Sequence, residues 1–354
     1  MMMKLLLVGI LLAVLIGAPI VSGQMGWAAS KEQKAIDKAL KRVGYKEVCL
    51  LGVTTKTNNQ TQVIYNNSNA GCGAPTPPVC PPGTHPSGGV CVPNENPTGV
   101  IPALNATKYV RVGVIGDVDS NSGWTTELNL FQKYQVQFVV LSGDFAYNNG
   151  KAVLDNLVAH GFTKINTALA VGNHDNCSMV KAWTGLSVCY GQRLFTDKVA
   201  VEVIDANSQF DCSGAQFAKV KSDLETSDAW YNLVSIHQPF ATVKSDHAPN
   251  GMFSCYHQVF KDNGVNLVAQ AHNHNWQYGF IDGITYGVFG TGTHDTGSSM
   301  YPCSSNNFNG NPMRCLTGTN GITVLDLQID NPDVKRINGY FVSNADKLVD
   351  KFVN

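Results

Sequence analysis

Five apolar runs that each stop at a polar side chain constrain this 354-residue chain more than any other feature. The most informative run, Val136 to Leu141, is followed by Gly143 and Asp144, as expected for a buried strand of a parallel sheet. The other four runs end at Asp117, Asn173, His237 and His272. The carboxyl ends of strands in an open α/β sheet are where such sheets place their sites, so we expect these side chains to converge.

The N-terminus has the pattern of a secretory leader. Lys4 precedes an apolar stretch from Leu5 to Val21, and the small residues Ser22 and Gly23 follow it. This order predicts a signal peptide over residues 1–23 and an extracytoplasmic or secreted protein. The alternative is an uncleaved membrane anchor, because about 17 apolar residues is the lower limit for spanning a bilayer. Membrane contact is expected only in that case.

Cysteine usage agrees with export. The chain has 10 cysteines, none of them in the expected leader, and an even count in an exported chain indicates disulfides. Close spacing favours the pairs Cys80–Cys91, Cys177–Cys189 and Cys303–Cys315. A zinc site made of cysteines is disfavoured because no CxxC pair occurs.

Composition divides the rest of the chain. Residues 24–70 are expected to form a small α+β unit, with a helix near 31–43 and strands near 46–55 and 61–65. Residues 71–106 are rich in Pro, Gly and Cys and predict a stiff linker. The main domain is expected over 107–345, followed by a C-terminal tail at 346–354.

The pattern of the main domain predicts an α/β fold. Strand-like runs alternate with helix-like ones, at 123–134, 151–160, 214–225 and 255–261. Later runs lack helices between them and predict antiparallel strands of a second sheet, at 284–289, 322–329 and 334–342. We therefore expect an α+β sandwich of layered β-sheets flanked by helices.

Charge argues against nucleic acid as a partner. Only 14% of the residues are charged, the net charge is −1, and no run of Lys and Arg occurs. Nucleic-acid binding through a basic face is therefore not expected.

The polar side chains at the strand ends suit metal ions. Their ligand atoms are oxygen and imidazole nitrogen, which favour Fe, Mn or Zn; the residues are Asp117, Asp144, Asn173, His237, His272 and His274. Such a set exceeds what one ion needs. Two ions about 3.5–4 Å apart that share a carboxylate are the usual hydrolytic arrangement.

These residues carry a resemblance to a known family. Five ordered blocks resemble those of the calcineurin-like metallophosphoesterases: Gly116-Asp117, Gly143-Asp144, Gly172-Asn173-His174-Asp175, His237, and Ala271-His272-Asn273-His274. Tyr147, three residues after Asp144, resembles the purple acid phosphatases, in which a tyrosinate binds ferric iron. Two positions depart from the family: Asp119 replaces a common His, and Ala271 replaces a Gly.

The resemblance implies a role for each position. Asp117, Asp144, Tyr147 and His274 would hold the first ion. Asp144 would bridge to a second ion, held with Asn173, His237 and His272. His174 would assist the leaving group, with Asp175 setting its tautomer, and His247 would be a second histidine that contacts substrate.

The implied activity is exported phosphomonoester hydrolysis, by in-line attack of a metal-bound hydroxide on a small phosphorylated substrate. Two ions per chain are implied, Fe with Zn, Mn or Fe. One alternative is a phosphodiesterase or nucleotidase using the same site. The other, motivated by Asp119, is a non-catalytic surface protein that keeps a metal-binding metallophosphoesterase fold. No feature of the sequence indicates the oligomeric state.

Overall fold

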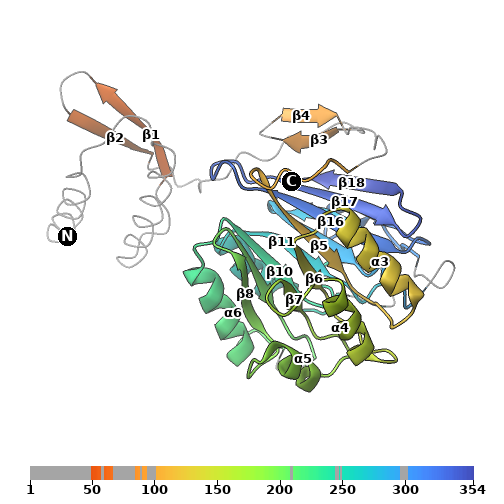
Figure 1. The fold of residues 1–354 in the computed structure, drawn as a ribbon. Helices are drawn as coiled ribbons and strands as arrows, with labels where there is room; N and C mark the ends of the chain where they lie inside the picture. The colour runs from red at the N-terminus through yellow and green to blue at the C-terminus, as the bar shows by residue number, and fades with distance from the viewer. Residues whose placement is uncertain are drawn as a thin grey trace. The chain divides into compact units, whose positions relative to one another are not determined.

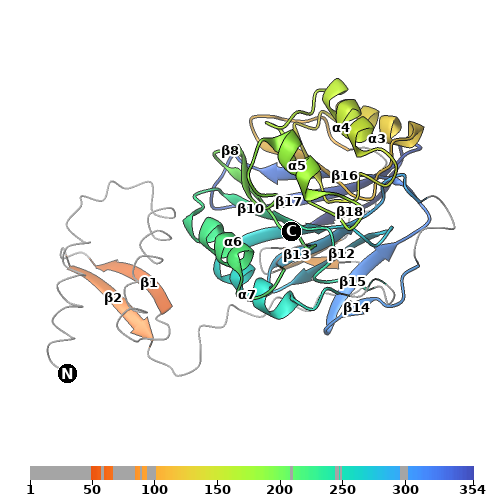
Figure 2. The ribbon, with the colours of Figure 1, turned by 90° about the horizontal axis from the view of Figure 1, so that it is seen from below.

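The computed structural model describes the strands of residues 49–93 and, beyond them, residues 101–207, 210–243, 247, 249–295 and 302–354. It divides into two compact units, Met1–Pro93 and Asn94–Asn354. The second unit contains all the candidate site residues and is shown from two directions in Figures 1 and 2.

The first unit contains two antiparallel hairpins. The first hairpin confirms the two strands expected between residues 46 and 65, and the second lies inside the segment expected to be a linker. The strands are β1 (Cys49–Lys56), β2 (Gln60–Asn66), β3 (Thr84–Ser87) and β4 (Val90–Pro93). The expected leader at 1–23, the expected helix at 31–43 and the side chains of the pair Cys80–Cys91 lie outside the described residues.

A six-stranded mixed sheet forms one layer of the second unit. Its order is β18-β17-β16-β5-β6-β7. Strands β5, β6 and β7 are parallel, whereas β16, β17 and β18 run antiparallel to their neighbours. The strands are β5 (Tyr109–Ile115), β6 (Phe138–Leu141), β7 (Thr167–Leu169), β16 (Gly321–Gln328), β17 (Ile337–Ser343) and β18 (Leu348–Val353).

An eight-stranded sheet forms the second layer, in the order β14-β15-β12-β13-β11-β10-β9-β8. Its centre is parallel, from β9 through β10 and β11 to β13. The strands are β8 (Gly191–Thr196), β9 (Val199–Val203), β10 (Tyr231–Ser235), β11 (Val265–Gln270), β12 (Trp276–Ile281), β13 (Ile284–Phe289), β14 (Asn307–Phe308) and β15 (Asn311–Leu316).

Five helices of the described residues flank the two sheets. In Figures 1 and 2, α3, α4 and α5 lie on the side of the six-stranded sheet, and α6 and α7 on the side of the other. Asparagine side chains cap α3, α4 and α5 by accepting hydrogen bonds from N–H groups of the first turn. The helices are α3 (Ser122–Lys133), α4 (Gly150–Ala159), α5 (Cys177–Thr184), α6 (Ala215–Thr226) and α7 (Phe253–Asp262).

Burial of both faces explains why the strands read as continuous apolar runs. On β5, Val112 and Val114 pack into the core between the sheets. Ile115 packs instead into the core under the helices, with Leu128 and Phe131 of α3. Because each central strand needs apolar side chains on both sides, its sequence does not alternate.

The strands are distributed differently from the expectation. The five runs belong to two sheets, because β10 and β11 lie in the eight-stranded one. Strands β16 and β17 extend the first sheet, not a second one, and β13 runs parallel to β11. Residues of the expected tail form β18. Apolar patterning reports burial, whereas long-range pairing decides which strands become neighbours.

Three disulfides occur among the described residues. Cys177–Cys189 and Cys303–Cys315 confirm two of the expected pairs. Cys212–Cys255 was not expected, because its cysteines lie 43 residues apart, before α6 and within α7. Disulfides in this number are typical of a protein that folds in an oxidising compartment outside the cytoplasm.

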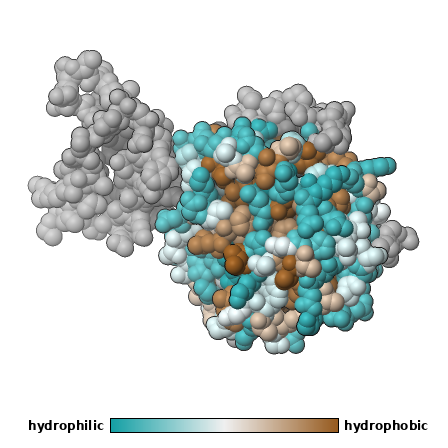
Figure 3. Space-filling model, in the orientation of Figure 1, coloured by the Kyte–Doolittle hydropathy of each residue, from teal (hydrophilic) through white to brown (hydrophobic). Residues whose placement is uncertain are grey.

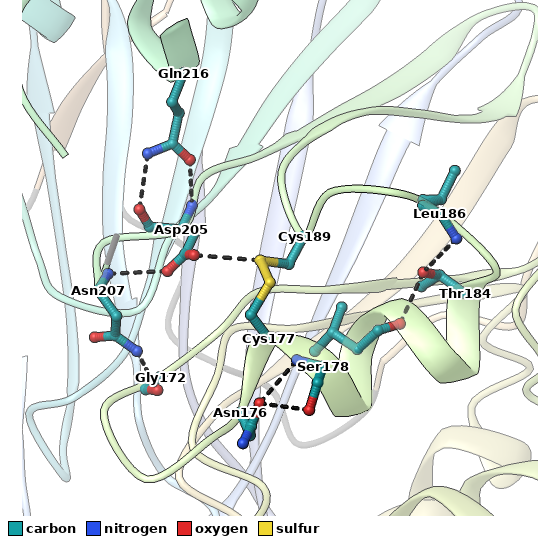
Figure 4. The surroundings of a disulfide bond; sticks show 11 residues. Gly172, Asn176, Cys177, Ser178, Thr184, Leu186, Cys189, Asp205, Asn207 and Gln216 are labelled. Atoms are coloured by element: carbon teal, nitrogen blue, oxygen red, sulfur yellow. Dashed lines mark hydrogen bonds between the residues drawn. A yellow bond between two sulfur atoms is a disulfide. The ribbon is translucent and has the colours of Figure 1, made fainter. Parts of the chain in front are cut away.

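The Cys177–Cys189 disulfide lies beside the end of β9 (Figure 4). There Asp205 places Oδ2 3.2 Å from Cys189 Sγ, and its backbone is held by the Gln216 side chain. Because the two sulfur atoms are bonded to each other, they offer no thiolate to a metal. Asn207, two residues beyond Asp205, donates a side-chain hydrogen bond to Gly172 O, which ties this region to the turn before Asn173.

The face seen in Figure 3 is largely hydrophilic, with apolar side chains scattered over it. None of the helices within the described residues combines the length and apolarity needed to cross a bilayer.

Candidate metal centre

Four of the candidate ligands converge from both sheets. Asp117 and Asp144 follow β5 and β6 of the first sheet, whereas His237 and His272 follow β10 and β11 of the second. Ligand atoms of Asp144, His237 and His272 all lie within 4.8 Å of one another. The strand ends predicted from sequence therefore meet at one point, between the two sheets.

Tyr147 points its hydroxyl into the same group. The phenol oxygen lies 3.1 Å from Asp117 Oδ1, 3.0 Å from Asp144 Oδ2 and 3.2 Å from His274 Nε2. These three residues are the ones expected to share an ion with Tyr147. A packing role alone would not require a hydroxyl between two buried carboxylates.

The imidazoles of His237 and His274 are each oriented by a hydrogen bond at Nδ1, while Nε2 faces a carboxylate of the group. His237 Nδ1 donates to Ser142 O at 2.9 Å, and its Nε2 lies 3.1 Å from Asp144 Oδ2. This Nε2 is buried and has no aligned hydrogen-bond partner within the described part of the chain. His274 Nδ1 lies 2.5 Å from Asp295 Oδ2, and its Nε2 faces Asp117 Oδ1 at 3.3 Å.

This arrangement fits metal ions. Metal-binding histidines usually donate from one ring nitrogen to a carboxylate or carbonyl and present the other nitrogen to the ion. His237 and His274 both do this, and buried carboxylates stand opposite their Nε2 atoms. The donor set of oxygen and imidazole atoms suits Fe, Zn or Mn.

Buried charges shift the pKa values of the histidines in opposite directions. Burial disfavours the charged imidazole, but the Asp144 carboxylate outweighs it and raises the pKa of His237 to about 9. The Asp117 carboxylate likewise raises the pKa of His274 to about 9 against the effect of burial. For His272, burial and the neighbouring His237 lower the pKa to about 4.

The same buried charges shift the pKa values of the acidic groups. Burial on its own raises the pKa of Asp117, yet His274 and His237 hold it well below the usual range. Burial, followed by the charges of Asp117 and Asp144, raises the pKa of the Tyr147 phenol. A phenol beside two carboxylates ionises only when a cation offsets their charge, so tyrosinate formation here requires a bound metal ion.

Three of the candidate ligands have left-handed backbone conformations. The φ angles are 59° at Asp117, 51° at Asp144 and 69° at His272. Such conformations cost about 1–3 kcal/mol each for residues other than glycine and cluster at functional sites. They turn the chain sharply at the strand end. Gly172 is required beside them, because a Cβ there would collide with the Asp144 carboxylate.

The Asp175 side chain stabilises the turn that contains Asp144. Its carboxylate accepts hydrogen bonds from the backbone N–H groups of Gly172, Asp144, Phe145 and Ala146, at 2.7–3.0 Å. These four donors occupy both carboxylate oxygens. The expectation that Asp175 sets the tautomer of His174 is therefore corrected, since the carboxylate is engaged by the backbone of the turn.

His174 and Asn173 lie at the exposed rim. The His174 N–H donates to Asp144 Oδ1 at 2.8 Å, and its ring centroid is 4.4 Å from that of Tyr147. The Asn173 side chain is exposed, and its assignment as a ligand stays a prediction. His247 contacts a different member of the group, with its ring centroid 4.3 Å from that of His272 and the two planes inclined by 86°.

Two site residues were missed in the sequence. His294 and Asp295 follow β13, and they lie against Tyr147 and His274 respectively. A weaker signal was present, because the apolar run Ile284–Phe289 is followed, after a short glycine-rich segment, by His294 and Asp295. Asp119 lies 3.9 Å from His294 Nδ1 and accepts a hydrogen bond from Asn148.

Comparison with known proteins agrees with this geometry. Residues 110–276 match the model of the calcineurin-like phosphoesterase family. This part of the chain is a calcineurin-like phosphoesterase domain. The matched residues include every candidate ligand and both rim histidines, so the phosphoesterase family covers the whole predicted centre. A search of curated proteins finds no match.

Solved structures share the phosphoesterase fold. GAP50, the anchor in the inner membrane complex of Plasmodium, has 15% identity and a TM-score of 0.53, over 69% of this chain and 88% of that one. Purple acid phosphatase PPD1 from yellow lupin (Lupinus luteus) seeds has 11% identity and a TM-score of 0.54, over 69% of this chain and 53% of that one. At these identities the likeness concerns the fold alone.

Proposed function

We propose that this protein is an exported, binuclear-metal phosphomonoesterase of the acid phosphatase type. The observation that carries the proposal is the position of the Tyr147 hydroxyl, between Asp117, Asp144 and His274. A tyrosine in this place adds an oxygen ligand that suits ferric iron, and it accompanies the family's other ligand positions.

The ions would be held as the sequence blocks imply. Asp117, Tyr147 and His274 would hold one ion, His237, His272 and Asn173 would hold the other, and Asp144 would be shared. When bound, two ions lower the pKa of a water molecule and neutralise charge on the phosphoryl group. The proposed pair is iron with zinc, manganese or a second iron.

The rim histidines act on the substrate. The His174 ring lies against Tyr147 and the His247 ring against His272, and neither histidine is in the proposed ligand set. In this proposal their ring nitrogens donate hydrogen bonds to phosphoryl oxygens, and His174 gives a proton to the departing alcohol oxygen. His174 is exposed, so it can take up a proton again from solvent.

Export is part of the proposal. The apolar stretch from Leu5 to Val21 and the disulfides of the phosphoesterase domain both support passage into an oxidising compartment.

A non-catalytic surface role is the second candidate. The fold likeness to GAP50, described as an anchor, and the unusual Asp119 favour it. Against it, Asp117, Asp144, His237, His272 and His274 are all present and converge. A centre kept only for fold stability has no need of exposed His174 at its rim.

The test is hydrolysis by the purified full chain after loading with iron, zinc or manganese. Phosphomonoesters that carry no nucleoside should be hydrolysed faster than phosphodiesters or nucleotides. His174→Ala should lower kcat by about 10²–10⁴-fold, whereas His160→Ala, which changes an imidazole at the end of α4, should not. Faster diester cleavage would favour the phosphodiesterase alternative. Two bound ions without any turnover would favour the surface protein.

A further inference from the structure

A cleft of about 910 Å³ lies next to the metal centre. Its walls come from the first turn of α3, the segment before β16 and the turn between β17 and β18, and include Asn121, Thr126, Thr293, Thr319, Asn344 and Lys347. None of these residues has a role in holding metal ions.

The cleft and the centre lie at the same edge of the six-stranded sheet. Strand β16 runs antiparallel to β5, so the start of β16 lies beside the end of β5. The segment that follows β13 lies between these two strand ends and is hydrogen-bonded to both. Gly292 N–H donates to Gly116 O at 3.0 Å, and Gly321 N–H donates to Thr291 O at 3.0 Å.

The two sites meet at consecutive residues of this segment. Thr293 lines the cleft, and the next residue, His294, stacks on Tyr147 in the centre. The Asn121 side chain, also in the cleft wall, donates to Thr293 O at 3.0 Å. A molecule whose phosphoryl group lies at the metal centre would therefore extend over His294 into the cleft.

The chemistry of the walls selects the kind of molecule. Most residues that line the cleft carry amides, hydroxyls or the Lys347 ammonium, and they lie beside the apolar residues Ala345, Leu348 and Val349; no acid and no aromatic ring is among them. Such walls offer hydrogen bonds in both directions and no surface for stacking. They suit a ligand with many hydroxyl groups, each of which can donate and accept.

Two oxygens of the walls lack partners. Within the described residues, Thr293 Oγ1 and Asn344 Oδ1 are buried and have no hydrogen-bond partner, and Thr293 is only 5% exposed. The Asn344 Nδ2 atom donates to Glu127 Oε1 at 3.3 Å, which orients its amide. Buried polar atoms in native proteins normally have partners, so these two oxygens are acceptors left unused in residues of the cleft wall.

We propose that this cleft is the leaving-group subsite, and that the substrate is the phosphomonoester of a neutral polyhydroxylated alcohol, such as a sugar or polyol. The inference rests on the proposed function. In the reaction, water forms the new P–O bond, the ester P–O bond breaks, and the departing alcohol oxygen takes a proton. The released products are inorganic phosphate and the free alcohol.

The experiment compares kcat/KM for glucose 6-phosphate and for p-nitrophenyl phosphate in the metal-loaded full chain. The ratio of interest is kcat/KM for glucose 6-phosphate divided by kcat/KM for p-nitrophenyl phosphate. Asn344→Leu and Lys347→Ala should each lower this ratio by about tenfold, the effect of one lost hydrogen bond. Lys221→Ala, which removes an exposed lysine of α6, is the matched control and should keep the ratio of the wild type. An equal ratio in all four proteins would overturn the proposal.

Direct binding separates this inference from the proposed function. Saturation-transfer NMR with free glucose, myo-inositol and glycerol needs no turnover. Binding by the wild type and its loss in Asn344→Leu would support the subsite even in a protein that hydrolyses nothing. Thr319→Val provides a second variant if Asn344→Leu unfolds. Normal monoester hydrolysis without any binding of the three alcohols would refute the proposal that the cleft is a leaving-group subsite, and it would leave the proposed function intact.

Discussion

The imidazole ring of His294 lies flat on the phenol ring of Tyr147, with centroids 3.3 Å apart and planes inclined by 5°. The His294 N–H also donates to Asp117 O at 3.1 Å. One residue is thus attached to the backbone of one proposed metal ligand and covers the side chain of another. We infer that this stack keeps the phenol oxygen between the two carboxylates.

Removal of the stack should loosen the metal ion held by Tyr147. A ring pair contributes about 0.5–1.5 kcal/mol, so His294→Ala should weaken metal retention by up to about tenfold. His294→Phe keeps a flat ring and should retain metal as the wild type does. Metal remaining after dialysis against graded chelator concentrations measures this, and equal retention by all three proteins would refute the role of the stack.

Asp295 should tune the centre through His274. Partners of this kind typically change metal affinity or activity by about 10–100-fold when mutated. Asp295→Asn keeps the size of the side chain but loses the charge that faces His274 Nδ1 at 2.5 Å. The metal affinity of Asp295→Asn should decrease by about 10–100-fold, and competition with a chromogenic chelator measures this decrease. Asp330→Asn, at an exposed position, serves as control, and a change no larger than in that control would contradict the assignment.

Metal binding should release protons. At pH 7, His237 and His274 are protonated because their pKa values are raised to about 9, whereas His272, with its pKa lowered to about 4, is neutral. Each ion that binds one of these Nε2 atoms displaces a proton from that imidazole, so the affinity for both ions should rise with pH up to about 9. Titration calorimetry in buffers of different ionisation enthalpy counts these protons. Affinity independent of pH between 6 and 9 would show that neither imidazole is a ligand.

Glu202 should make the domain less stable as pH rises. Its carboxylate is buried on β9 and has no hydrogen-bond partner within the described residues. Burial, followed by the charge of Asp223, raises its pKa well above the usual range. The folded state then keeps its proton when the unfolded state has lost it, so stability is full below the ordinary pKa and falls as pH increases.

Glu202→Gln removes this titration. The variant should be more stable than the wild type at pH 8, on the order of 1 kcal/mol, and the difference should vanish near pH 4. Urea unfolding at both pH values measures the free energy of unfolding. Glu225→Gln, on the exposed end of α6, should match the wild type at each pH. A destabilised Glu202→Gln at pH 8 would mean that the carboxylate has a stabilising partner.

Much of the centre could be predicted from the sequence because its residues sit at the ends of buried strands. The apolar runs before Asp117, Asp144, His237 and His272 are local signals, and the structure places all four together. His294 and Asp295 follow the same kind of run, yet a single His-Asp pair in a glycine-rich loop does not show which side chains it will meet.

Other features depend on contacts between distant segments. The family resemblance implies that Asp175 sets the tautomer of His174, but the turn closes so that four backbone N–H groups reach its carboxylate. The Cys212–Cys255 bond needs α6 and α7 to be neighbours, which no local pattern indicates. The cleft beside the centre likewise exists only after β16 has paired with β5.

The central claim is that Asp144 is shared by two metal ions at the meeting point of the two sheets. Metal analysis of the purified full chain, loaded and then freed of loosely bound ions, tests it most directly. We expect two ions per chain in the wild type, one of them iron, and at most one ion with no phosphomonoester turnover in Asp144→Asn. A wild type that holds no more than one ion, or an Asp144→Asn protein that keeps two ions and full activity, would contradict the claim.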